Sequence, residues 1–155
     1  MIRWVITKHK YNDYSYLFDI RDFCVKQMRD METITYLDET LKPSKAFFKD
    51  TKTAIKNEGI KFKYRHIRYF TTENGSHFVY GSYRGHSILR GRKNNIVILN
   101  NFNCCPERLQ EEIEKCHFPV WASVLCTTVI VTLDESKPTG TIIDNLIKRY
   151  GCSHT

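Results

Sequence analysis

The apolar positions at the start of the chain follow a period of two and then a period close to 3.6. Residues 2–7 alternate between apolar and other side chains, which predicts a strand with Ile2, Trp4 and Ile6 on one side. Residues 14–30 carry apolar side chains at intervals of 3, 4, 4 and 3, which predicts a helix with one broad apolar stripe. The stripe comprises Leu17, Ile20, Cys24, Met28 and Met31. We expect it to face the core.

A weak strand and a second helix are predicted next. Residues 33–37 form a short β-branched run, which indicates a strand. Pro43 suits the first turn of a helix and Gly59 suits its end, so we expect a helix over residues 43–59. Its outer edge carries a row of lysines, namely Lys45, Lys49, Lys52 and Lys56.

The middle of the chain predicts an antiparallel hairpin. Cations and rings alternate over residues 61–66, and a return strand is expected over residues 77–83. Asn74-Gly75 is typical of a two-residue type I′ turn, which would pair Thr72 with His77 and Phe70 with Val79. Another short strand is a candidate at residues 86–89.

The last third predicts two strands that alternate with two helices. The strands are expected at residues 95–99 and 123–133, and the helices at residues 106–116 and 139–150. This order favours a parallel strand pair joined by a right-handed crossover. We therefore expect a mixed α/β (α+β) fold with a single mixed sheet, an antiparallel Asn-Gly hairpin, a C-terminal βαβα unit and helices packed on the sheet. Residues 1–155 are expected to form a single domain.

Charge is unevenly distributed along this pattern. Residues 60–93 contain eight basic residues and one acidic residue, Glu73, so this stretch alone carries +7, equal to the net charge of the whole chain. Cations neutralise phosphates and flat rings stack on unpaired bases. The sequence therefore predicts a nucleic-acid-binding domain, for RNA or single-stranded DNA, without its own catalysis. The candidate binding residues are Lys61, Lys63, Arg65, Arg68, Arg84, Arg90, Arg92 and Lys93.

Two other interpretations of the basic stretch stay open. The rings Phe62, Tyr64, Phe70, Phe78 and Tyr80 would be core residues if the cations only solvate the outer face. The basic face could also meet an acidic protein partner, which would make the chain a protein-interaction domain.

The cysteines and the apolar runs give no sign of a metal, a cofactor or a membrane. Cys104, Cys105, Cys116 and His117 contain zinc-binding residue types, but their spacing is unlike that of a zinc knuckle, so we expect no metal and no cofactor. The N-terminal apolar run is too short for a signal peptide, and no run is long enough to cross a bilayer. We expect free thiols, an intracellular location and no membrane partner.

Two short segments resemble motifs of a known enzyme family. Arg3-Trp4-Val5-Ile6-Thr7 is similar to the first strand motif of rolling-circle replication initiators from small single-stranded DNA viruses, and residues 73–77 resemble their acidic-and-histidine metal motif. The resemblance covers about fifteen residues and implies a metal-dependent nuclease with Glu73 and His77 in its site. The chain departs from the family at Val79, where a second metal-binding side chain is expected, and it lacks the tyrosine pattern of the family's nucleophile. The nuclease is therefore the alternative function. We expect that the chain is not an enzyme.

A second resemblance concerns nucleotide-binding helicase cores. Residues 96–101 resemble the hydrophobic strand that ends in a magnesium-binding carboxylate, and Asn100 and Asn101 occupy the carboxylate positions. No glycine-rich phosphate loop precedes Lys52-Thr53. An active ATPase is therefore not expected, whereas an inactive α/β core of this kind stays open.

Overall fold

The computed structural model describes residues 1–91, 94–123 and 127–154, and its framework is one eight-stranded mixed sheet. The strand order is β3-β4-β5-β2-β6-β7-β1-β8. The strands are β1 (Ile2–His9), β2 (Thr33–Asp38), β3 (Phe62–Arg65), β4 (Tyr69–Thr72), β5 (His77–Ser82), β6 (Ile96–Leu99), β7 (Thr127–Asp134) and β8 (Ser153–His154). The helices are α1 (Tyr16–Gln27), α2 (Leu41–Asn57), α3 (Glu107–Ser123) and α4 (Thr141–Tyr150), and short 3-10 helices are η1 (Met28–Asp30), η2 (Tyr83–Leu89) and η3 (Phe102–Cys104).

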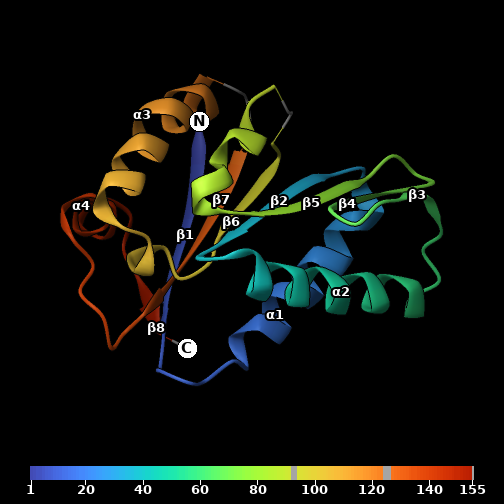
Figure 1. The fold of residues 1–155 in the computed structure, drawn as a ribbon, viewed down its shortest axis with the longest axis horizontal. Coiled ribbons are helices and arrows are strands. Elements are labelled where there is room, and N and C mark those ends of the chain that lie inside the picture. The colour runs from blue at the N-terminus through green and yellow to red at the C-terminus, as the bar shows by residue number, and fades with distance from the viewer. Residues whose placement is uncertain (92–93, 124–126, 155) are drawn as a thin grey trace.

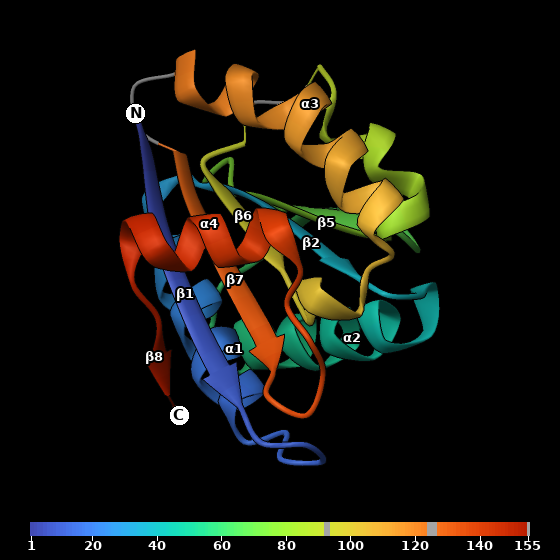
Figure 2. The ribbon, with the colours of Figure 1, turned by 90° about the vertical axis from the view of Figure 1, so that its left-hand side faces the viewer.

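Helices cover both faces of this sheet and make a three-layer structure (Figure 1). Helices α1 and α2 pack on one face around a core that includes Phe47, Phe78 and Ile98. Helices α3 and α4, with η2, pack on the other face around a core that includes Val97, Ile113 and Val131. Figure 2 shows the second layer from the front, with α4 crossing over β1 and β7. The predicted class, a mixed sheet with helices packed on it, is confirmed.

Five adjacent strands, β5, β2, β6, β7 and β1, run parallel and form the centre of the sheet. The pair β6 and β7 is in register from Ile96 opposite Thr128 to Leu99 opposite Val131, with α3 between them in the chain. The predicted C-terminal βαβα unit is therefore confirmed. All four residues of β6 are buried, as a strand covered on both faces requires.

The hairpin exists, but its turn and its strand count differ from the prediction. Residues 61–83 form a three-stranded antiparallel arrangement at the edge of the sheet, and β5 then pairs with β2 in parallel. Thr71, not Thr72, lies opposite His77, and Tyr69, not Phe70, lies opposite Val79. The loop is longer than two residues, and only Gly75 in it has a positive φ, at 93°.

Tertiary hydrogen bonds account for this longer turn. The amide of Asn74 donates to the carbonyl of Met28 at 2.8 Å, and the hydroxyl of Ser76 donates to the same carbonyl at 2.7 Å. Ser76 also accepts the backbone N–H of Glu32 at 3.1 Å. The turn is thus held against η1 and the start of β2. A tight type I′ turn would leave these bonds unmade.

Three other local predictions are wrong. Residues 86–89 belong to η2 rather than to a strand. The third long helix continues past the predicted end at residue 116 and reaches Ser123, with Pro119 inside it, so β7 begins at Thr127 instead of residue 123. Met31 is 68% exposed and has a left-handed backbone, which removes it from the apolar stripe of α1.

No helix in the described part of the chain is both long enough and apolar enough to span a membrane.

Candidate functional site

A basic groove lies between α2 and the β3–β4 hairpin. It has a volume of about 530 Å³ and is lined by Lys45, Phe48, Lys49, Lys52, Arg65, His66 and Ile67. The lysines sit at positions i, i+4 and i+7 of α2, so they share one face of the helix. Arg65 ends β3, and His66 and Ile67 lie in the three-residue connection to β4. Two segments that are far apart in the chain therefore supply four cations to one groove.

The two acidic residues nearest to these cations in the chain, Asp50 of α2 and Glu58 just after it, pair with arginines of α1 and η1. Asp50 pairs with Arg21 of α1 at 3.2 Å, and Glu58 pairs with Arg29 of η1 at 3.0 Å. Both acids are thus neutralised on the side of α2 that faces α1. Among the described residues, no ion pair involves Lys45, Lys49, Lys52 or Arg65. The groove therefore keeps a positive charge that the protein itself does not cancel.

Rings lie below the groove, whereas Tyr64 lies on the other face of the hairpin, because it pairs with Thr71 while Arg65 pairs with the buried Phe70. Tyr64 is 61% exposed, with the Lys63 ammonium 5.7 Å from its ring centroid, whereas Phe70 and Phe78 are fully buried. A break in register between Phe62 and Tyr64 interrupts the alternation that would have turned Tyr64 inward. The interpretation of all five rings as core residues is therefore wrong for Tyr64. The ring of His66 stacks on Tyr69 at 4.8 Å.

The structure divides the predicted binding residues between the two faces of the sheet. Lys61, Lys63 and Arg68 are exposed on the hairpin beside Arg65. Arg84 and Arg90 are exposed in and just after η2, whose buried Tyr83 and Leu89 belong to the core under α3 and α4. These two arginines are thus on the far layer from the groove. The last two predicted cations, Arg92 and Lys93, lie outside the described residues.

The residues of the nuclease alternative make contacts that fit a folded hairpin. Glu73 is exposed in the turn, and its backbone N–H donates to the carbonyl of Lys61 at 2.9 Å. His77 lies 3.0 Å from the hydroxyl of Thr71 through Nδ1, and its ring lies 5.3 Å from that of Tyr69. In residues 1–91, 94–123 and 127–154, no three His, Cys, Asp or Glu side chains are grouped to hold a metal ion.

The cysteines near α3 likewise belong to no metal-binding group among the described residues. Cys104 and Cys105 are free thiols, and burial raises the pKa of each to about 12. His117 instead contacts Nδ1 of His86 through Nε2 at 2.9 Å, and its ring lies 5.9 Å from that of Trp121. Burial, together with His86 and Arg90 nearby, lowers the pKa of His117 to about 4.

A second polar site, which the sequence did not predict, lies at the carboxyl ends of β2 and β6. The amide of Asn100 donates to Oδ2 of Asp38 at 2.8 Å, and the hydroxyl of Tyr36 donates to the same oxygen at 2.9 Å. The hydroxyls of Tyr16 and Thr132 both donate to Oδ1 of Asn100, at 2.9 and 2.7 Å. Four secondary-structure elements therefore meet in one hydrogen-bonded cluster.

Asp38 carries the only carboxylate inside that cluster. It is 2% exposed, and its Oδ1 accepts the backbone N–H of Glu39 at 2.8 Å. Burial raises the pKa of Asp38 to about 6, although the bonds from Asn100, Glu39 and Tyr36 act in the opposite direction. The carboxylate is mostly ionised at neutral pH and has only neutral donors around it.

Asn100 and Asn101, at the carboxylate positions of the helicase resemblance, take part in internal contacts. Oδ1 of Asn101 lies 2.6 Å from Nε2 of His9, whose ring stacks on Tyr16 at 3.9 Å. Their amides are thus held by β1, α1 and β7.

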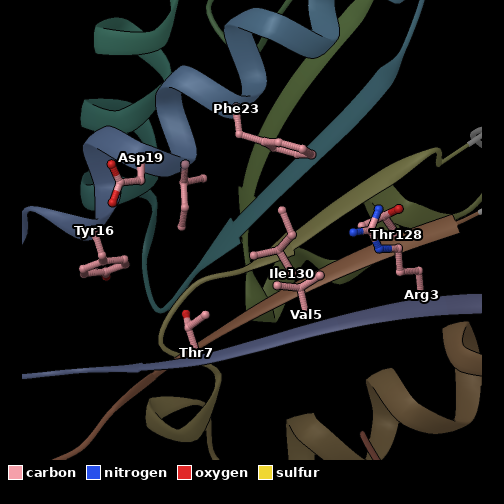
Figure 3. Close-up of a pocket in the computed structure, with 9 residues that line it drawn as sticks. Arg3, Val5, Thr7, Tyr16, Asp19, Phe23, Thr128 and Ile130 are labelled. Carbon is pink, nitrogen blue, oxygen red and sulfur yellow. The ribbon is translucent and has the colours of Figure 1, made fainter. Parts of the chain in front are cut away.

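Two cavities flank the first turn of α1, and both include Tyr16 in their walls. One, of about 430 Å³, opens at the carboxyl ends of β2 and β6 between α1 and α2. The other, of about 290 Å³, lies between α1 and the strands β1 and β7; Figure 3 shows Val5, Phe23 and Ile130 in its wall and Arg3 beside Thr128. The second cavity is mostly apolar.

The sequence carried a partial signal for these sites. The lysine row of α2 was visible from its helical spacing, but nothing local placed it beside Arg65. Asp38 fell in a predicted connection, and only the pairing of β2 with β6 brings it to Asn100. Comparison of the chain with protein-family models and with curated proteins yields no match.

Proposed function

We propose that this chain binds single-stranded nucleic acid, RNA or DNA, in the groove between α2 and the β3–β4 hairpin. The observation that carries the proposal is the convergence of Lys45, Lys49, Lys52 and Arg65 on one groove without an internal counter-charge. A protein that neutralises phosphates releases condensed counterions, which gives binding free energy without reading sequence.

The lysine row of the groove matches a short stretch of nucleic acid in length. Lys45 and Lys52 are seven residues apart on α2, a rise of about 10 Å at 1.5 Å per residue. At the 3.4 Å axial rise that each strand has in B-form DNA, that length corresponds to about three stacked nucleotides. His66, which lines the groove and stacks on Tyr69, adds a ring on which an unpaired base can stack, worth about 1–3 kcal/mol.

The test is fluorescence anisotropy with labelled oligouridylate and oligothymidylate over about 50–200 mM salt. The variant Lys45→Ala, Lys49→Ala, Lys52→Ala, Arg65→Ala should bind much more weakly. Its log–log salt slope should be smaller by about 3, at about 0.7 per lost phosphate contact. The matched control is Arg108→Ala, Lys115→Ala, Lys137→Ala, Lys148→Ala, which removes the same charge from exposed positions on the other layer.

The outcomes separate the proposal from its alternatives. Equal loss of binding in both quadruple variants would reduce the interaction to net charge and reject the groove. Cleavage of the strand that requires a divalent ion and disappears in His77→Ala would favour the nuclease. Binding to acidic peptides with no binding to either oligonucleotide would favour the protein-interaction domain.

A further inference from the structure

The cavity at the carboxyl ends of β2 and β6 lies where the chain topology opens the edge of the sheet. Strand β2 continues into α2 on one face, whereas its neighbour β6 continues through η3 into α3 on the other. Adjacent parallel strands whose connections leave on opposite faces leave a crevice outside their carboxyl ends, where α/β proteins bind ligands. The cavity volume of about 430 Å³ falls within the ordinary range for small-molecule sites.

The charge of this cavity is opposite to that of the protein. Its lining contains Asp38, Glu39 and Asp50 but no lysine, arginine or histidine, although the chain carries +7. Asp50 is paired with Arg21, and Glu39 is exposed. Asp38 is the buried member, and no ion pair found among the described residues includes it. A buried carboxylate held only by neutral donors favours a cation as its ligand.

Aromatic rings form much of the remaining wall. Tyr36 stacks on Phe47 at 4.2 Å in the interior, while Tyr14 and Phe18 are 61% and 54% exposed at the rim. The guanidinium of Arg21 already lies 5.0 Å from the ring centroid of Phe18. Ring faces of this kind attract desolvated cations.

We propose that this cavity binds a small organic ammonium ion, with the charged nitrogen at Asp38 and the apolar body against the rings. An organic ion fits better than a metal ion, because hard metal ions favour several carboxylate ligands and no three His, Cys, Asp or Glu side chains are grouped to hold one among the described residues. The site is separate from the basic groove, and its ligand carries the opposite charge.

The test is isothermal titration calorimetry of the full chain with 2-phenylethylammonium at about pH 8, where Asp38 is ionised. The neutral 2-phenylethanol and the anionic 3-phenylpropanoate are the matched ligands. We expect the ammonium ion to bind in the millimolar range or tighter and the alcohol to bind about tenfold more weakly, since a hydrogen bond to a charged group is lost. The carboxylate ligand should not bind.

Three variants locate the site. Asp38→Asn should weaken ammonium binding about tenfold, and Asp30→Asn, which removes the same charge from an exposed position, should not. Phe18→Ala should weaken ammonium binding about threefold. Because Phe18 is an exposed rim residue, this variant keeps the fold and still tests the site if Asp38→Asn does not fold. Equal affinity for the ammonium ion and the alcohol, absence of ammonium binding, or unchanged affinity in Phe18→Ala would overturn the proposal. The quadruple groove variant should bind the ammonium ion normally, which separates this proposal from the one for nucleic acid.

Discussion

The side-chain amide of Asn100 donates to the carboxylate of Asp38 across 2.8 Å and joins the ends of two adjacent parallel strands. The donor is neutral, so Asp38 receives a hydrogen bond without a counter-charge. The identity of residue 100 therefore decides the charge balance of the cluster.

Asn100→Asp should destabilise the protein at neutral pH and do so less at acidic pH. The substitution replaces a donor with a second carboxylate beside Asp38, and two adjacent carboxylates cannot both ionise without a large cost. We expect a loss of about 2–4 kcal/mol near pH 8, measured by urea unfolding, and a smaller loss near pH 5.

Asn101→Asp is the matched control for that experiment. It adds the same charge one residue later, but there the carboxylate would lie next to His9 rather than Asp38. We expect less destabilisation than in Asn100→Asp at each pH, because the added carboxylate is not beside Asp38. Equal losses in the two variants at both pH values would contradict the role given to Asp38.

Asp38 and His117 should give opposite pH dependence of stability. The pKa of Asp38 is raised to about 6 in the folded state, so the folded protein holds the extra proton and its stability falls as the pH rises from about 4 to about 6. The pKa of His117 is lowered to about 4, so the unfolded chain holds the extra proton and stability rises with pH from about 4 to about 6.5. The two contributions oppose each other over most of this range.

Single variants should separate these contributions. In His117→Gln only Asp38 contributes, so stability should fall as the pH rises. In Asp38→Asn only His117 contributes, so stability should rise with pH. Other ionisable side chains surround both groups. Asp38 faces Glu39, Tyr36 and Tyr16. His117 faces His86 and Arg90, and Glu112 pairs with His86. The measurement is the free energy of unfolding at several pH values, with His154→Gln, at an exposed position, as the control. Slopes that do not change, or change in the same direction, would rule this account out.

Ser76→Ala should loosen the turn between β4 and β5. The Ser76 side chain is fully buried, donates to the carbonyl of Met28 and accepts the N–H of Glu32. Its removal breaks the bond to the N–H of Glu32 and one of the two bonds to the carbonyl of Met28, which Asn74 still contacts, so we expect a loss of about 1–3 kcal/mol in unfolding experiments. Ser136→Ala, at an exposed turn, should cost less, and a reversed order would count against the anchoring of the turn.

Gly81→Ala should be destabilising because of one neighbouring side chain. A methyl group at residue 81 would lie 2.6 Å from Cδ1 of Ile88 and 3.3 Å from Cδ2 of Leu37. Overpacking of this kind costs about 1–3 kcal/mol. Ile88→Val removes the closest atom, so the double variant should be more stable than the sum of the two single changes predicts. Additive losses in this double-mutant cycle would mean that backbone conformation, not the contact with Ile88, excludes alanine.

The sequence by itself determined the features that depend on local periodicity. The apolar runs of β6 and β7, the amphipathic helix α2 and its lysine row were readable, because each depends on the spacing of neighbouring residues along one element. The parallel pairing of β6 with β7 followed from the helix between them. The basic stretch was also visible, since charge is a property of composition.

Only the tertiary structure decided which of these residues meet. Lys45 of α2 and Arg65 of β3 share a groove because the hairpin folds back beside the helix, and Arg84 goes to the opposite layer because η2 buries Tyr83 and Leu89 under α3. The turn at Gly75 departs from its local signal because Ser76 bonds to Met28, which is 48 residues away. Asp38 and Asn100 are 62 residues apart and meet only through strand pairing. Long-range packing and hydrogen bonds compete with local preference, and a single sequence contains no direct measure of that competition.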